Sequence, residues 1–145
     1  MILGDANVWL ALALSGHVHH RRARTWFQNM VEMDGIRFCR ATQQTLLRLL
    51  TTASVLAPYG SPPLSNVQAW AIYEAFVADD RVALQLDEPV NLEQHWKSYA
   101  VRDTPSPKLW MDAYLAAFAT AGRLQLVTTD AAFRQFAGLD LIVLG

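Results

Sequence analysis

Short apolar runs alternate along the chain with segments whose apolar residues recur at helical spacing. The runs have strand length, and the segments between them place an apolar residue at every third or fourth position. The pattern predicts strands at residues 2–4, 36–39, 81–86, 124–127 and 139–144, and helices at 7–14, 20–31, 42–52, 65–77, 91–100, 108–120 and 130–136. Strands that alternate with helices imply an α/β fold with a mainly parallel sheet.

The ends of several predicted elements carry recognisable signals. Thr42 and Ser65 are predicted to cap the helices that they open, and Asp130 is predicted to open the last short helix. Residues 57–63, Ala-Pro-Tyr-Gly-Ser-Pro-Pro, break the pattern and are predicted to form a loop inside one domain. With 145 residues, of which 52% are hydrophobic, residues 1–145 are expected to form a single domain with a continuous core.

Composition indicates the cellular environment of the protein more than its function. A formal net charge of −1 gives no global attraction to nucleic acid or to a membrane surface, so any polyanion would have to be held locally. The only cysteine, Cys39, cannot form an internal disulfide, which favours a reducing, cytoplasmic location. No stretch approaches the roughly 20 apolar residues that a membrane span requires, so no membrane association is expected.

Three aspartates are the candidate functional residues. Asp5 directly follows the first predicted strand, and Asp130 follows the strand at 124–127. In an open parallel sheet the carboxyl ends of the strands are where ligands bind, so both acids could face one crevice. Asp112 borders the apolar face of the helix at 108–120. Carboxylates are ligands for Mg²⁺ and Mn²⁺, which activate water for phosphodiester hydrolysis, although an acid at a helix start is also a common cap.

Other polar groups are weaker candidates. Asp87 and Glu88 precede a proline and are interpreted first as turn or capping residues. The histidines at 17, 19 and 20 have no matching cluster elsewhere, which disfavours a transition-metal site. The arginines of the helix at 20–31 form either a solvated face or a phosphate contact. The five tryptophans are interpreted as core residues.

Four segments together resemble the PIN domain, and in particular the VapC-type toxin ribonucleases of type II toxin–antitoxin pairs. They are Asp5-Ala6-Asn7, the segment Cys39–Gln43 with Leu46–Thr51, the segment Trp110–Ala119 (WMDAYLAAFA), and the segment Leu126–Phe133 (LVTTDAAF). The resemblance covers nearly the whole chain. It implies a three-layer α/β/α sandwich, endonucleolytic cleavage of RNA by a metal-activated water, a cognate VapB-type antitoxin that covers the site, and a homodimer.

The resemblance also assigns roles to residues. Asp5, Asp112 and Asp130 correspond to the family's metal-binding acids, with Mg²⁺ or Mn²⁺ as the cofactor, and Asn7 and Thr128 would orient them. Many PIN domains carry a further glutamate on the second conserved helix, but the corresponding segment here, residues 43–45 (Gln-Gln-Thr), has no acid. The candidate RNA contacts are Arg21, Arg22, Arg24, Arg40 and Arg48.

Two alternatives remain beside the nuclease. A PIN-like interaction module that has lost an acid and only binds an antitoxin-like partner would explain the missing glutamate. A phosphorylatable receiver domain would share the layers, but it needs an acidic pair after the first strand, where Asp5 stands alone.

Overall fold

The computed structural model describes residues 1–31 and 35–145, and its strands form one sheet in which every neighbouring pair is parallel. The spatial order is β3-β2-β1-β4-β5. The chain therefore builds outward from β1 in one direction and later returns to add β4 and β5 on the other side. In open α/β sheets, ligands bind at the carboxyl ends of the strands where the order reverses, which here is between β1 and β4. The strands are β1 (Ile2–Gly4), β2 (Ile36–Cys39), β3 (Val82–Gln85), β4 (Gln125–Thr128) and β5 (Leu141–Val143).

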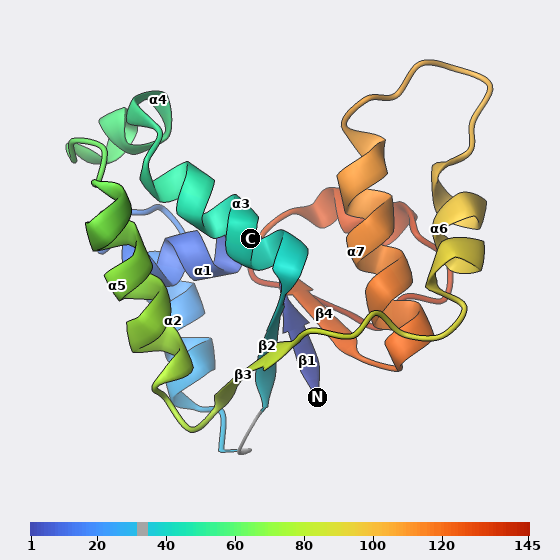
Figure 1. The fold of residues 1–145 in the computed structure, drawn as a ribbon, viewed down its shortest axis with the longest axis horizontal. Helices are drawn as coiled ribbons and strands as arrows, with labels where there is room; N and C mark the ends of the chain where they lie inside the picture. Colours follow the sequence, from blue (N-terminus) through green and yellow to red (C-terminus); the bar gives the residue numbers. More distant parts are fainter. Residues whose placement is uncertain (32–34) are drawn as a thin grey trace.

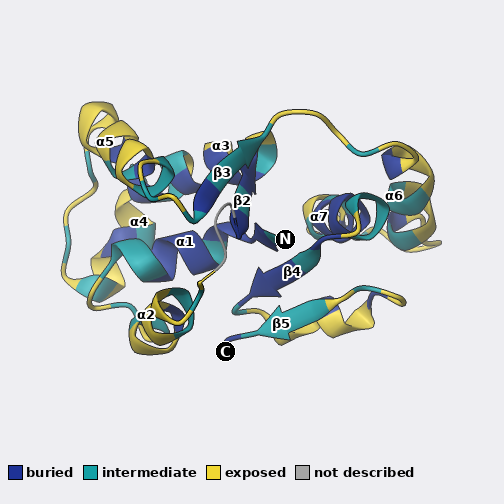
Figure 2. Cartoon of the chain, turned by 90° about the horizontal axis from the view of Figure 1, so that it is seen from below, coloured by how far each residue is buried: buried dark blue, intermediate teal, exposed yellow. Residues whose placement is uncertain are grey.

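Helices cover both faces of the sheet, which confirms the three-layer α/β/α architecture (Figures 1 and 2). One layer contains α1 (Ala6–Ala13), α2 (His20–Gln28), α3 (Arg40–Leu50), α4 (Ala53–Leu56) and α5 (Asn66–Val77). The other contains α6 (Leu92–Ala100) and α7 (Leu109–Gly122). Two 3₁₀ turns, η1 (Ala57–Tyr59) and η2 (Ala131–Gln135), complete the described elements. None of the helices formed by the described residues is long and apolar enough to cross a membrane.

Each face of the sheet has its own apolar core, so the strands are apolar on both sides. Toward α1, the Trp9 indole stacks on Phe38 at a centroid separation of 3.9 Å and donates a hydrogen bond of 3.2 Å to the Gly4 carbonyl. A Cβ on Gly4 would lie 2.7 Å from Trp9 Nε1, so this close packing requires glycine. Toward α7, Leu3 and Leu126 are fully buried in the second core.

Several predicted helix boundaries are wrong, and hydrogen bonds explain two of them. The helix predicted at 20–31 ends at Gln28, because its last backbone bonds tighten to three-residue spacing, with the Met30 N–H bonded to the Phe27 carbonyl. The helix predicted to begin at Thr42 begins at Arg40 with Cys39 at the N-cap position. The Thr42 hydroxyl accepts a hydrogen bond of 3.0 Å from the Cys39 N–H, so Thr42 satisfies the helix start from inside the first turn.

The segment between α3 and α5 is partly as predicted. The predicted loop at 57–63 begins with a 3₁₀ turn that directly follows α4, an element that the pattern did not predict. The Ser65 cap is confirmed: its hydroxyl accepts from the Gln68 N–H at 3.1 Å, and Gln68 Oε1 accepts from the Ser65 N–H at 2.9 Å. The Asp130 cap is also confirmed, because Asp130 Oδ1 accepts from the Ala132 N–H at 2.9 Å.

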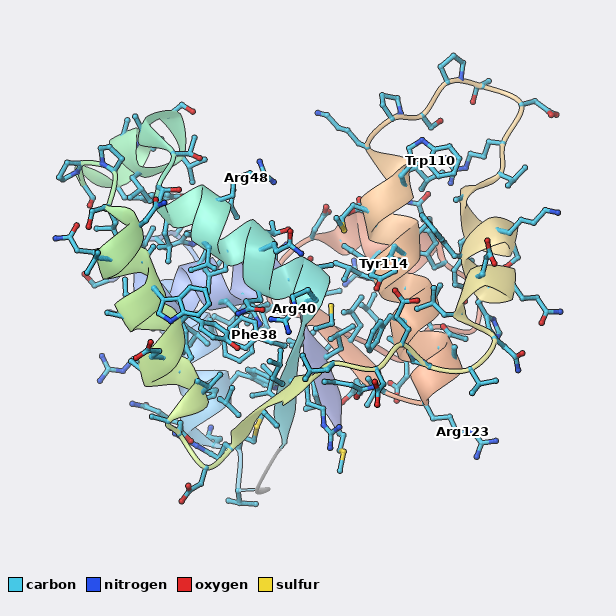
Figure 3. All side chains as sticks on the ribbon, in the orientation of Figure 1. Phe38, Arg40, Arg48, Trp110, Tyr114 and Arg123 are labelled. Atoms are coloured by element: carbon cyan, nitrogen blue, oxygen red, sulfur yellow. The ribbon has the colours of Figure 1, made fainter. Side chains whose placement is uncertain are left out.

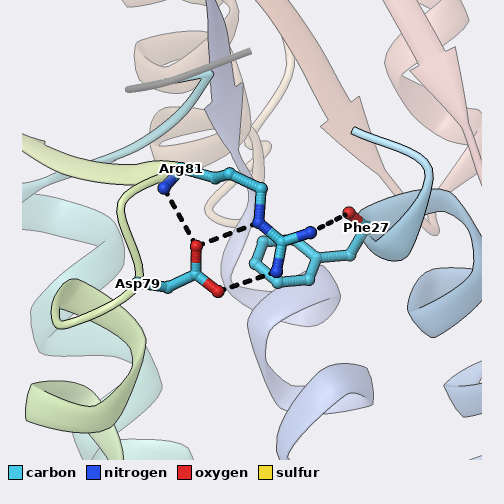
Figure 4. Close-up of polar contacts among 3 residues, drawn as sticks. All are labelled: Phe27, Asp79 and Arg81. Atoms are coloured by element: carbon cyan, nitrogen blue, oxygen red, sulfur yellow. Dashed lines mark hydrogen bonds and ion pairs between the residues drawn. The ribbon is translucent and has the colours of Figure 1, made fainter. Parts of the chain in front are cut away.

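A bidentate ion pair ties the amino end of β3 to α2 (Figure 4). Arg81 Nε and Nη2 donate to the Asp79 carboxylate at 2.9 and 2.7 Å. Arg81 Nη1 donates to the Phe27 carbonyl at 3.0 Å, and the guanidinium carbon lies 4.2 Å from the centroid of the Phe27 ring. Arg81 therefore joins the α5–β3 turn to the end of α2.

Candidate active site

Asp5 stands where β1 ends and α1 begins. Its backbone is extended (φ −67°, ψ 150°) at the N-cap position, but its side chain makes no capping hydrogen bond to the helix. The side chain is 8% exposed, and its Oδ2 accepts a hydrogen bond of 2.8 Å from the Thr128 hydroxyl. Asp5 is therefore tied to β4, at the point where the strand order reverses.

The Thr128 hydroxyl is the centre of the polar network at this edge of the sheet. Thr128 is the last residue of β4 and is fully buried. Besides donating to Asp5, its Oγ1 accepts from Asn7 Nδ2 and from the Asp130 N–H, both at 3.1 Å. Asn7 Oδ1 in turn accepts from the Thr129 N–H at 3.0 Å. The network fixes the start of α1 against the end of β4.

Asp112 and Asp130 reach the same region from two other elements. Asp130 is exposed and begins η2 directly after β4. Asp112 is half-buried in the first turn of α7, the helix that packs against β4. Both carboxylates act electrostatically on Asp5. The three aspartates that the sequence singled out therefore lie within electrostatic range of one another.

The electrostatics of this group favour a cation. Burial raises the pKa of Asp5 to about 6 against the opposing hydrogen bond from Thr128, and the carboxylates of Asp112 and Asp130 add to the rise. Burial also raises the pKa of Asp112, and the Asp130 carboxylate contributes. Across residues 1–31 and 35–145 the only ion pair is the one between Arg81 and Asp79, so no basic side chain there neutralises these acids. A bound cation would relieve both the burial cost and the repulsion.

The oxygen donors suit a hard divalent cation, but they do not form a complete cage. Among the described residues, no three His, Cys, Asp or Glu side chains are grouped closely enough to hold an ion by themselves. Mg²⁺ commonly keeps several waters and takes only one or two carboxylates together with substrate phosphate oxygens. A sparse set of carboxylates at a buried, negatively charged edge fits that mode of binding.

Comparison with known proteins identifies the family. The PIN domain family matches residues 2–139. Ribonuclease VapC41 of Mycobacterium tuberculosis is 59% identical over 144 residues, which are 99% of each chain. The chain belongs to the PIN-domain family, among the VapC-type toxin ribonucleases.

Solved structures show the same fold at lower identity. VapC20 of Mycobacterium tuberculosis, described as a sarcin–ricin loop cleaving toxin, aligns with a TM-score of 0.65 at 19% identity and 96% coverage of both chains. VapBC2 from Rickettsia felis, bound to a DNA fragment from its promoter, aligns with a TM-score of 0.63 at 13% identity. That alignment covers 99% of this chain and 98% of the other. The α/β sandwich is therefore the VapC fold.

In this VapC-type PIN domain, a glutamine occupies the inward-facing position of the first turn of α3. Of residues 43–45, Gln43 is buried, with 3% of its surface exposed, whereas Gln44 is exposed. Gln43 Oε1 accepts a hydrogen bond from Arg40 Nη1. The start of α3 therefore carries a buried neutral amide that accepts a hydrogen bond from an arginine, where many PIN domains carry a glutamate.

The predicted RNA-contacting arginines lie in three settings. Arg22 Nη1 donates to the Gly145 carbonyl at 2.9 Å, and the neighbouring Leu144 N–H bonds to the Thr128 carbonyl at 2.8 Å. Arg22 therefore lies at the same edge of the sheet as the acids. Arg40 is engaged with Gln43, and Arg48 is exposed on α3 (Figure 3). Arg21 and Arg24 are exposed elsewhere on α2.

Sequence reasoning missed two features near the site. It assigned all five tryptophans to the core, but Trp110, on the helix α7 that carries Asp112, is 55% exposed. Helix α7 carries more apolar residues than one face can bury, so apolar periodicity could not separate the exposed positions from the buried ones. Glu88, interpreted as a turn or capping residue, accepts a hydrogen bond of 3.1 Å from the Tyr114 hydroxyl.

Proposed function

We propose that this VapC-type ribonuclease cleaves RNA endonucleolytically, with Asp5, Asp112 and Asp130 holding Mg²⁺ or Mn²⁺ against the scissile phosphate. The observation that carries the proposal is the buried Asp5 carboxylate, which lies among other acids and has a pKa raised to about 6. Such a group destabilises the folded protein unless a cation occupies the site. When bound, the ion would supply Lewis-acid activation of water and neutralise charge that develops at phosphorus.

The chain's own residues hold this arrangement in place. Thr128 and Asn7 hold the Asp5 carboxylate and the start of η2 through one network, which keeps Asp5 and Asp130 in register before a ligand arrives. Arg22 at the same edge is placed to contact RNA phosphate, and Arg40 and Arg48 on α3 extend the basic rim, with Arg21 and Arg24 on α2 as further candidates. Local basic side chains would compensate for the near-neutral net charge.

The partners in this proposal are an RNA substrate, a VapB-type antitoxin and a second copy of the chain. Structures similar to this one include a VapBC complex and a toxin–antitoxin complex from Klebsiella pneumoniae, which supports an antitoxin as the regulatory partner. The identity of this chain to Ribonuclease VapC41 supports RNA as the substrate. The homodimer rests on the family resemblance alone.

The test is cleavage of total cellular RNA by purified protein, free of antitoxin, with and without Mg²⁺ or Mn²⁺. Discrete fragments that require the metal, and that disappear in both Asp5→Asn and Asp112→Asn, are the expected result. Asp103→Asn is a matched control, because Asp103 is an exposed loop carboxylate in the α6–α7 connection. Fragment ends identify the substrate sequence.

The second candidate is an interaction module without nuclease activity, which the neutral Gln43 at the α3 position favours. It predicts antitoxin binding without metal-dependent fragments. Wild-type protein that is folded and antitoxin-free, but gives the same RNA profile as Asp5→Asn, would replace the nuclease proposal with this one.

A further inference from the structure

The outer side of α7 carries an aromatic groove that the catalytic residues do not use. Trp96 of α6 and Trp110 of α7 line a hollow of about 600 Å³ together with Ala100, Val101 and Lys97. The volume falls within the range of about 300–1,000 Å³ that is usual for small-molecule sites. Trp110 also lines a second hollow together with residues of the loop at 101–107.

Trp110 is held in place even though it is exposed. The Trp96 indole N–H donates a hydrogen bond of 2.9 Å to the Trp110 carbonyl, and the two rings meet edge to face at a centroid separation of 6.4 Å. Trp96 also contacts Tyr114 edge to face, which anchors it to the next turn of α7. A rigid, half-exposed indole offers a flat surface at small entropic cost.

The position of Trp110 links the groove to the acids. It lies two residues before Asp112, which is a rise of about 3 Å, and about 200° around the helix. Figure 3 shows Trp110 beside the end of α7 that leads into the loop from α6. Because a helix with its side chains is about 10 Å across, a strand that passes the N-terminal turn of α7 can reach both residues within a few nucleotides.

The charges around the groove favour a polyanion. Lys97 lines one hollow and Arg102 the other, and Lys108 is exposed at the N-cap position of α7. Glu93 is the one acid among the residues that line the two hollows. Aromatic rings flanked by basic side chains are the usual composition of surfaces that bind single-stranded nucleic acid.

We infer that an unpaired base of the RNA substrate stacks on Trp110, with Lys97, Arg102 and Lys108 contacting the adjoining phosphates. The inference rests on the proposed function, because it concerns how RNA bound at the three acids continues past α7. Stacking is tolerant of base identity and needs the base to be unpaired. The groove therefore selects single-stranded RNA or a loop over a duplex.

The test measures binding of a short, unstructured, fluorescently labelled oligoribonucleotide to the Asp5→Asn protein, which does not cut it. Adding Trp110→Ala should weaken binding about tenfold, whereas Trp110→Phe should retain most of the affinity because an aromatic face remains. Val67→Ala is the control for loss of exposed apolar surface: Val67 is 82% exposed on α5, in the opposite layer, and its loss should leave the affinity unchanged. Thermal unfolding of each variant verifies that it is folded.

Three outcomes would overturn the inference, and they separate it from the proposed function. Equal RNA affinity of the Trp110→Ala and Val67→Ala proteins would show that the groove does not bind RNA and would leave the nuclease proposal intact. Loss of antitoxin binding with unchanged RNA binding would assign the groove to a protein partner. Absence of RNA binding by the Asp5→Asn parent itself would count against the proposed function, and the inference would fail with it.

Discussion

Two aspartates at opposite ends of the sheet have opposite electrostatic surroundings. Asp79 precedes the amino end of β3 and receives hydrogen bonds from the Arg81 backbone N–H, Nε and Nη2. These hydrogen bonds lower the pKa of Asp79 to about 2. Asp5, at the carboxyl end of β1, is buried among other carboxylates, and burial raises its pKa to about 6. One acid stabilises the fold at neutral pH, and the other destabilises it.

The difference lies in where each acid obtains its positive partner. Asp79 takes it from its own turn, two residues along the chain. Asp5 has a hydroxyl and other acids as neighbours, and its natural partner is a cation from solution. A carboxylate that costs folding free energy and sits where the strand order reverses is better explained by function than by stability.

The largest effect is expected from Asp5→Asn. Near pH 7 and without divalent metal, this change removes a buried charge and should raise the free energy of unfolding by up to about 3 kcal/mol, following the raised pKa. Metal-dependent RNA cleavage should fall by more than about 100-fold, because even outer partners of metal ligands contribute about 10–100-fold. Urea unfolding in a metal chelator and a cleavage assay measure the two quantities. A variant less stable than wild type under these conditions would contradict the comparison.

Thr128→Val is expected to have the next largest effect. It keeps the shape of the side chain but leaves the Asp5 carboxylate, Asn7 Nδ2 and the Asp130 N–H without their shared partner. Unfolding free energy should fall by about 1–3 kcal/mol, and cleavage by about 10–100-fold. Since the Thr128 hydrogen bond lowers the pKa of Asp5, its removal should raise that pKa further, which an NMR titration detects. Thr128→Ser retains the hydroxyl and should behave nearly as wild type.

The sequence predicted the layers and the acids because both depend on local signals. Apolar runs that alternate with amphipathic segments define strands and helices, and Asp5 and Asp130 follow strands directly. Parallel strands bring such residues to one edge, where the carboxylates of Asp112 and Asp130 contribute to the raised pKa of Asp5. Their role as metal ligands stays a prediction.

What the sequence did not predict depends on tertiary packing. The start of α3 was misplaced because Thr42 satisfies the Cys39 N–H from inside the helix, where it resembles a cap in sequence. The exposure of Trp110 could not be predicted, because apolar residues surround it in the sequence of α7. Which of them are buried depends on how α6 packs against this helix. The burial of Gln43 could not be predicted either, because it depends on α3 beginning at Arg40 and not at Thr42.

A third prediction concerns pH and follows from the sign of each shift. Because Asp5 has a raised pKa, its contribution favours the folded metal-free protein at low pH and is lost as the pH rises through about 6. Metal affinity should instead be higher at high pH. It should fall about tenfold for each pH unit below about 6, because the proton and the metal compete for the Asp5 carboxylate. Calorimetric metal titrations of wild type across this range measure the slope. In Thr128→Val the pH at which affinity begins to fall should move upward, because the Thr128 hydrogen bond lowers the pKa of Asp5; an unchanged onset would disconnect the pH dependence from Asp5.

The smallest effect is expected from Asp79→Asn, the same chemical change as Asp5→Asn at the other end of the sheet. Because the pKa of Asp79 is lowered, its contribution is present above the ordinary value of 3.8 and is lost as the pH falls toward 2. The Asp79 side chain is 31% exposed, so screening limits the loss of unfolding free energy near neutral pH to about 1 kcal/mol or less. Arg81 keeps its contact with the Phe27 ring and carbonyl, and RNA cleavage should be unchanged.

Urea unfolding measures this loss of unfolding free energy relative to wild type. The loss should be present near neutral pH and absent near pH 2. A deficit that persists at low pH would mean that Asp79 acts through packing, and the contrast between the two acids would then no longer be electrostatic.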